Sequence, residues 1–205
     1  MFRRAEFRLA SLSLLAAAAV LAAPPAAAQF SDAYSFLQAV EKRDGDKVTS
    51  LLTSSDTRVI NTRNPDTGET ALAIVVKRRD LTWLRFLLGK DADPAIADRQ
   101  GMTPLMHAAM IGFADGADVL LDHGAPIDQA NRRGETALIL AVQARNNAMV
   151  RLLVKRGANP DTADHIAGLS ARDYAKRNDR TGQLAALLDA KPDRVRDTGA
   201  VFGPQ

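Results

Sequence analysis

Cysteine and histidine, which often act as metal ligands or in catalysis, are scarce in this chain of 205 residues. The sequence contains no cysteine and three histidines, at His107, His123 and His165. No two of these histidines have the spacing of paired metal ligands, and the metalloprotease sequence HExxH does not occur. We therefore expect no metal ion and no cofactor, and we interpret His107 as a hydrogen-bonded structural residue on a buried helix face.

Motifs of nucleophilic and phosphate chemistry are absent as well. The chain has no GxSxG elbow, no glycine-rich phosphate loop and no cysteine nucleophile. The lack of cysteine also excludes disulfides and the lipid anchor of a bacterial lipoprotein. We expect a protein that is not an enzyme, and the alternative is a hydrolase whose site is assembled only by folding.

The first 28 residues have the order of an export signal. Three arginines fall within residues 1–8, an apolar run follows over residues 9–23, and small alanines close the segment at residues 26–28. The apolar run is shorter than the roughly 20 residues that span a bilayer, which disfavours the alternative of a membrane anchor. We expect a signal peptide that is cleaved, over residues 1–28, and a mature protein without a membrane span in the periplasm or outside the cell.

The charge balance of the expected mature chain excludes one class of partner. Three of the 27 basic residues and one of the 24 acidic residues lie in residues 1–28, which leaves 24 basic and 23 acidic residues. A net charge of +1 and an aromatic content of 5% give little support for binding nucleic acid. We therefore expect no nucleic-acid partner.

A similar segment recurs along the chain at a nearly constant spacing. Gly68, Gly101, Gly134 and Gly168 each open a similar segment, at spacings of 33, 33 and 34 residues. A fixed period of this size indicates a solenoid, because one small unit cannot bury its own apolar face and must stack on copies of itself.

Each unit carries the signals of a turn followed by two helices. Gly101 stands in a turn, where a positive φ is easiest for glycine, Thr103 can cap the next helix, and Pro104 suits its first position. Gly124 ends the second helix and is free to take the left-handed conformation. Asp91 occupies the position of Gly124 in the preceding unit, so we expect Asp91 to be left-handed too.

These segments resemble the ankyrin repeat, which combines a turn, a Thr-Pro-Leu-like cap and two antiparallel helices. The likeness departs from the usual pattern at His107, which lies one place late, and at Ser170, which begins Ser-Ala-Arg in place of Thr-Pro-Leu. The resemblance implies an all-α fold, an ankyrin-repeat solenoid of about five helix-turn-helix units with hairpin-like turns. The outer units, which differ from the rest, would act as caps.

We place the ankyrin repeat domain at residues 29–191. Its expected units are, approximately, residues 32–63, 64–98, 99–131, 132–165 and 166–191. Residues 192–205 lack helical periodicity and are interpreted as a flexible C-terminal tail, the alternative being that Val201 and Phe202 dock on the last unit.

The resemblance also implies where binding occurs. Repeat proteins of this kind bind through the turn tips and the exposed face of the first helices, whose residues do not pack and are free to vary. Basic residues dominate these positions around an apolar centre, which is the composition of a protein-binding surface. The candidate partner-binding residues are Lys77, Arg78, Arg99, Gln100, Met102, Met110, Ile111, Arg132, Arg133, Glu135, Gln143 and Arg145.

We therefore expect a monomeric, exported adaptor that binds one protein partner of acidic or mixed charge. Three alternatives remain open at this point. The chain could be an inhibitor or immunity-type protein of an envelope enzyme, it could be a secreted effector, or its basic residues could be no more than solvated surface charges.

Overall fold

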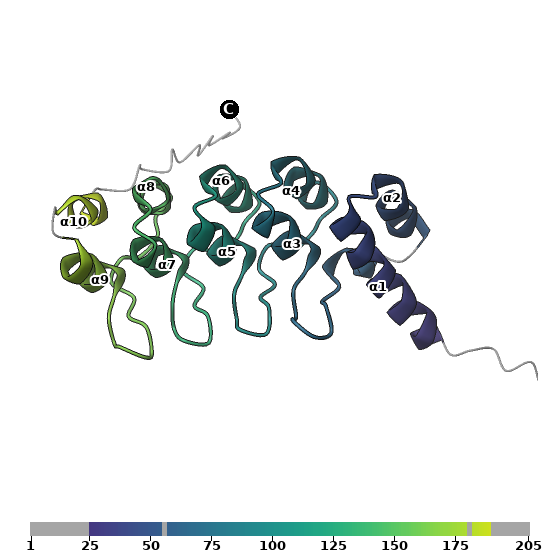
Figure 1. Ribbon diagram of the computed structural model, residues 1–205, viewed down its shortest axis with the longest axis horizontal. Coiled ribbons are helices and arrows are strands. Elements are labelled where there is room, and N and C mark those ends of the chain that lie inside the picture. Colours follow the sequence, from purple (N-terminus) through teal and green to yellow (C-terminus); the bar gives the residue numbers. More distant parts are fainter. Residues whose placement is uncertain (1–24, 55–56, 180–181, 190–205) are drawn as a thin grey trace, which may run out of the picture.

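In the computed structural model the described part of the chain comprises residues 25–54, 57–179 and 182–189, and it consists of helices joined by turns (Figure 1). The prediction of an all-α ankyrin-repeat solenoid is confirmed. Within these ranges no strand forms, and the only β-type contact is an isolated bridge between Ala163 and Ser170. The helices are α1 (Pro25–Lys42), α2 (Gly45–Ser54), the 3-10 helix η1 (Thr57–Asn61), α3 (Ala71–Lys77), α4 (Leu81–Leu88), α5 (Pro104–Ile111), α6 (Ala114–Asp122), α7 (Ala137–Gln143), α8 (Asn147–Lys155), α9 (Ala171–Asn178) and α10 (Gln183–Leu188).

The helices form five pairs that lie side by side (Figure 1). The first helices of the pairs make one row and the second helices make another, and the row of first helices lies between the turns and the second helices. Helix α5 packs on α3 and α7 as well as on its own partner α6. Each pair therefore shares its apolar side chains with its neighbours, as a solenoid requires.

Two expectations concern the ends of the chain. Helix α1 begins at Pro25, so residues 25–28, which the sequence places in the signal peptide, are helical. The rest of that predicted signal, residues 1–24, and the predicted tail, residues 192–205, lie outside the described residues.

The cap predicted at Thr103 forms, and most other units have a cap at the same place. The hydroxyls of Thr103 and Thr136 accept hydrogen bonds of 3.3 Å from the backbone N–H groups of Met106 and Ile139. Ser170 caps α9 in the same way and shares a reciprocal pair of hydrogen bonds with Asp173. Thr70 is the exception, because its buried hydroxyl accepts no cap hydrogen bond.

The left-handed conformation predicted for Asp91 is confirmed. Asp91 has φ +62°, close to the φ of +82° at Gly124, which stands at the same place in the next unit. An aspartate tolerates this conformation less well than glycine does.

The turns stack on one another through the backbone. The N–H groups of Arg99, Arg132 and His165 each donate to a carbonyl of the turn before, at 3.0, 3.1 and 2.8 Å. At Gly101, where φ is +81°, a Cβ would lie 2.8 Å from the N atom of Arg132. Only glycine allows this approach, so the repeated glycines set the spacing between units as well as the shape of each turn.

Candidate functional site

Every turn begins with an asparagine or aspartate that organises its backbone. In Asp98, the Oδ1 atom accepts hydrogen bonds of 2.9 Å from the N–H groups of Gln100 and Met102. In Asn131, Oδ1 accepts in the same way from Arg133 at 2.8 Å and from Glu135 at 2.9 Å. The side chain of this first residue is therefore held rigidly, and its second polar atom points to a defined place.

The second polar atom finds a different partner in each unit. Nε2 of His107, in α5, lies 2.9 Å from Oδ2 of Asp98. In the last unit the hydroxyl of Tyr174 donates to Oδ2 of Asp164 at 2.6 Å. Asn131 instead donates from Nδ2 to the carboxylate of Glu135 at 2.9 Å. Each pairing satisfies a polar group that would otherwise be buried without a partner.

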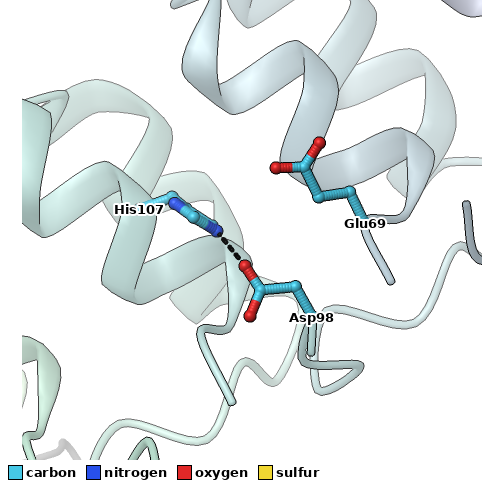
Figure 2. A group of neighbouring side chains, drawn as sticks. All are labelled: Glu69, Asp98 and His107. Atoms are coloured by element: carbon cyan, nitrogen blue, oxygen red, sulfur yellow. Dashed lines mark hydrogen bonds and ion pairs between the residues drawn. The ribbon is translucent and has the colours of Figure 1, made fainter. Parts of the chain in front are cut away.

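The His107–Asp98 pair has a second carboxylate beside it. Glu69, from the turn before α3, completes a group in which one ligand-type atom from each residue lies within 4.8 Å of the others (Figure 2). The side chains of His107, Asp98 and Glu69 are 5%, 3% and 20% exposed. Among the described residues this is the one cluster of histidine, aspartate and glutamate that tight.

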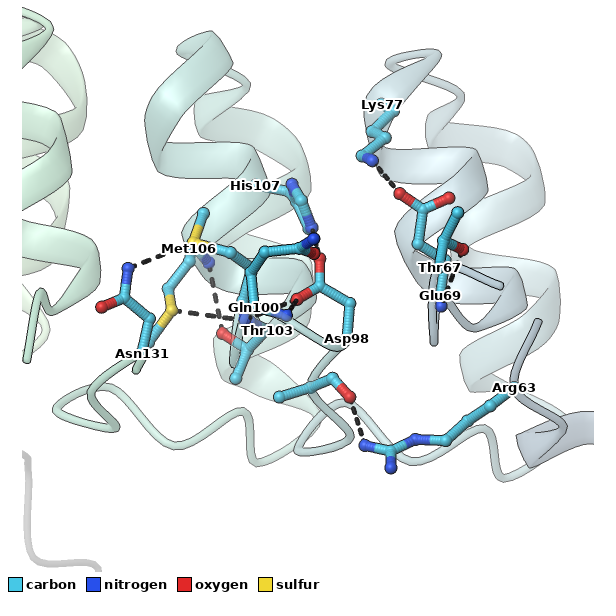
Figure 3. A network of polar contacts seen from close by, with 12 residues as sticks. Arg63, Thr67, Glu69, Lys77, Asp98, Gln100, Thr103, Met106, His107 and Asn131 are labelled. Atoms are coloured by element: carbon cyan, nitrogen blue, oxygen red, sulfur yellow. Dashed lines mark hydrogen bonds and ion pairs between the residues drawn. The ribbon is translucent and has the colours of Figure 1, made fainter. Parts of the chain in front are cut away.

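A lysine neutralises part of the charge of this cluster. The Nζ atom of Lys77, at the end of α3, points toward Glu69 and forms an ion pair with its carboxylate (Figure 3). Lys77 is 41% exposed and Glu69 is half-buried, so the ion pair stands at the mouth of the cluster, above the buried His107–Asp98 pair.

The surroundings of His107 favour its neutral form. Burial lowers the pKa of His107 below its ordinary value of 6.5, and the charge of Lys77 acts in the same direction, against the hydrogen bond to Asp98. A carboxylate only accepts hydrogen bonds, so Nε2 of the neutral imidazole carries the hydrogen and donates the hydrogen bond to Asp98. The other ring nitrogen, Nδ1, is buried and has no hydrogen-bond partner within the described part of the chain.

The prediction that His107 is a buried, hydrogen-bonded residue is therefore confirmed. The prediction for Glu135 as an exposed turn-tip contact is wrong, because Glu135 is only 6% exposed. Its carboxylate turns inward to accept from Asn131, and its backbone N–H donates to the same side chain. Glu135 thus supports its own turn.

The other candidates differ in how much of their surface is free. Met102, Arg78 and Ile111 are half-buried, and Met102 and Ile111 pack against the core. The remaining candidates are exposed: Lys77, Arg99, Gln100, Met110, Arg132, Arg133, Gln143 and Arg145.

Several of the basic candidates are occupied within the chain. Arg78 donates to the carbonyls of Val40 at 2.9 Å and Glu41 at 2.8 Å, near the end of α1. Arg99 donates to the carbonyl of Pro65 in the turn before. These guanidinium groups bind carbonyls of the neighbouring unit and so hold adjacent units together.

Free cations are found further along the row. Arg132 and Arg145 are exposed, and their side chains make no hydrogen bond or ion pair with other described residues. Arg133 forms one ion pair with the residues that the structure describes, to Glu135 at 3.6 Å. Met110, which is 50% exposed, lies near the end of the adjacent first helix, α5. The surface around α5, α7 and the turn between them therefore combines unpaired guanidinium groups with an exposed apolar side chain.

A comparison with protein families decides how these repeats are classified. The family described as ankyrin repeats, in three copies, matches residues 36–131 and 74–164. The chain belongs to the ankyrin repeat family. Ankyrin repeats are protein-interaction modules and are typically non-catalytic, so a general role in binding protein follows from membership.

The chain spans 27% or less of the length of three curated relatives that it matches. An ankyrin repeat-containing protein of Treponema pallidum (strain Nichols) is 42% identical over 81 residues, which is 40% of this chain and 27% of the relative. Inversin of Gallus gallus is 33% identical over 107 residues, or 52% of this chain and 10% of inversin. A human channel, transient receptor potential cation channel subfamily A member 1, is 32% identical over 97 residues, which is 46% of this chain and 9% of the channel.

Sequence reasoning missed the cluster of Glu69, Asp98 and His107. One signal was available, because a turn aspartate followed nine or ten residues later by a polar residue recurs as Asp98 with His107 and Asp164 with Tyr174. The part played by Glu69 had no local signal, since it comes from the preceding ankyrin unit. Separately, no helix of the described residues has the length and apolar character needed to cross a membrane.

Proposed function

We propose that this ankyrin-repeat protein is a non-catalytic binding module, exported from the cytoplasm, that docks an acidic segment of a protein partner. The proposed docking face consists of Met110, Ile111, Arg132, Arg133, Gln143 and Arg145. The observation that carries the proposal is that Arg132 and Arg145 have no partner within the described chain, whereas Arg78 and Arg99 do.

The chemistry of the docking face favours a carboxylate-bearing partner. A guanidinium group binds a carboxylate through two parallel hydrogen bonds, and such bonds are about twice as strong as neutral ones. Arg132 precedes α7 in the chain and Arg145 follows it, and both supply such donors, while Met110 supplies an apolar contact that a partner can cover. An apolar centre with an arginine rim is typical of the residues that dominate binding energy at protein interfaces.

The fold also reduces the cost of binding. The turn that carries Arg132 is tied to the turn before it by its own N–H and to the turn after it by the carbonyl of Arg133. A surface held in this way loses little conformational entropy when a partner docks, so more of the contact energy contributes to affinity.

A proposed export signal restricts where the partner is found. If residues 1–28 direct export, the docking face meets its partner in the periplasm or outside the cell. Cell fractionation combined with N-terminal sequencing of the mature protein tests this part, and a protein retained in the cytoplasm with its first 28 residues intact would contradict it.

Photo-crosslinking in intact cells tests the docking face. A photoreactive amino acid is placed at Met110, and captured proteins are identified by mass spectrometry. We expect one dominant protein with an acidic segment at the crosslink. The double variant Arg132→Glu/Arg145→Glu, in a chain that keeps the crosslinker, is expected to abolish capture.

A matched control separates the docking face from overall charge. Arg85→Glu/Arg151→Glu changes the net charge by the same amount on the exposed side of the second helices α4 and α8. This control is expected to retain capture. Equal loss in both double variants would show that the docking face is wrongly placed. An activity assay on a captured enzyme would distinguish an inhibitor from an adaptor.

A further inference from the structure

We propose that Glu69, Asp98 and His107 form a binding site for one divalent transition-metal ion, of which Zn²⁺ fits the donor set best. The donors would be Nε2 of His107, Oδ2 of Asp98 and a carboxylate oxygen of Glu69, and one ligand-type atom from each of the three residues lies within 4.8 Å of the others. Imidazole nitrogen and carboxylate oxygen are established ligands of Zn²⁺, and three protein ligands leave a fourth position for water. This proposal does not depend on the docking face.

Two of the three ligands are fixed in place before a metal binds. The second oxygen of Asp98 is held by the N–H groups of Gln100 and Met102, so the atom that faces His107 cannot turn away. His107 is 5% exposed on α5, whose first turn is capped by Thr103. Outer hydrogen bonds that orient a ligating carboxylate are what a metal site needs to bind without first ordering its ligands.

The cluster already attracts a cation. Two carboxylates stand beside a neutral imidazole, and the ammonium group of Lys77 is paired with Glu69 (Figures 2 and 3). Lys77 is thus paired directly with one of the three proposed ligands. We infer that this ammonium takes the place of a metal in the metal-free chain. Because Lys77 is 41% exposed, it can leave for solvent when a divalent ion arrives.

Binding requires one proton to move. The proton on Nε2 of His107 must leave for that nitrogen to coordinate, and the free Nδ1 position can take it, so the imidazole stays neutral. Two carboxylates balance the charge of a divalent ion once Lys77 has withdrawn. Hard ions such as Ca²⁺ and Mg²⁺ prefer six or more oxygen ligands, so they are expected to bind weakly here.

The other units of the chain act as internal comparisons. Leu140 stands where His107 stands, and the turn below it begins with Asn131, which offers no carboxylate. In the last unit Tyr174 takes that position, and its hydroxyl donates a hydrogen bond to Asp164. In the described chain the three ligand types meet only at the junction of α3 and α5.

Calorimetric titration of the full chain with Zn²⁺, after treatment with EDTA, tests the site. The background carries His123→Gln and His165→Gln, so that His107 is the remaining histidine. We expect one Zn²⁺ per chain and a shift of the Nε2 resonance of His107 in ¹⁵N NMR spectra. Lys77→Met, which removes the competing ammonium, is expected to tighten binding, and Glu69→Gln to weaken it at least about tenfold.

Controls make each outcome decisive. Glu69 is partly exposed, so Glu69→Gln is expected to fold, which circular dichroism verifies. Asp66→Asn removes an exposed carboxylate from the same turn and should leave Zn²⁺ affinity unchanged. The proposal is overturned if Lys77→Met shows no binding, if Glu69→Gln binds as the background does, or if Zn²⁺ leaves the His107 resonance unmoved.

Discussion

His107 of α5 donates a hydrogen bond of 2.9 Å to Asp98 in the turn before that helix, and both side chains are buried. The same relationship links Tyr174 to Asp164 in the last unit. Where the helix carries Leu140, the turn begins with Asn131, whose amide donates to Glu135 instead. An aspartate in the turn thus occurs together with a hydrogen-bond donor on the helix, because a buried carboxylate without a hydrogen bond destabilises the folded chain.

A double-mutant cycle measures the worth of this pair. His107→Leu leaves one oxygen of Asp98 buried and unpaired, so we expect it to lower the free energy of unfolding by about 1–3 kcal/mol. Asp98→Asn in addition should recover part of that loss, because the pair then resembles Asn131 and Leu140. Urea denaturation gives both values, and strictly additive effects would contradict the coupling.

The lowered pKa of His107 predicts a dependence of stability on pH. The unfolded chain takes up a proton near the ordinary pKa of 6.5, whereas the folded chain does so only at a lower pH. The free energy of unfolding should therefore fall as pH falls through 6.5 and stop falling below the folded pKa.

Thermal melts in the presence of EDTA, over about pH 5.5 to 7.5, measure this dependence. The Asp98→Asn/His107→Leu variant, which lacks the buried imidazole, serves as the reference. Its melting temperature should change less over this range than that of the wild type. If the two chains show parallel profiles, His107 is not the group that titrates.

A comparison of Gly101 with Gly168 distinguishes two reasons for a glycine in the turn: the positive φ and the close approach of the next unit. Both have a positive φ, +81° and +64°, but a Cβ at Gly101 would lie 2.8 Å from the next unit, whereas one at Gly168 meets nothing within 4 Å. Gly168→Ala is expected to cost about 1–2 kcal/mol for the backbone conformation alone. Gly101→Ala should cost clearly more, because the turns must also move apart. Equal losses in urea denaturation would remove the stacking argument.

Asp91 is a site where the chain can be made more stable. Because Asp91 has φ +62°, Asp91→Gly should raise the free energy of unfolding by about 0.5–1 kcal/mol. The reverse change, Gly124→Asp, occurs at an equivalent turn with open space around the Cβ position and should cause a loss of similar size. Urea denaturation of both variants checks the pair, and an unchanged midpoint for Asp91→Gly would count against relief of strain.

The sequence by itself determined the period, the helix pairs, the cap at Thr103 and the left-handed residue at Asp91. These features could be predicted because each depends on contacts within one turn or helix, and the chain repeats them several times. A signal that recurs at a fixed spacing is stronger than any single occurrence of it.

Only the tertiary structure decided what happens between units. Glu69 joins Asp98 and His107, Arg78 binds carbonyls near the end of α1, and Glu135 turns inward. The sequence predicts every turn tip to be exposed, whether or not its side chain binds the neighbouring unit. Those contacts depend on the distance between units, which is set by stacking. Within the described ranges, that stacking leaves Arg132 and Arg145 without a partner and occupies Arg78 and Arg99, and no local sequence pattern distinguishes the first two arginines from the other two.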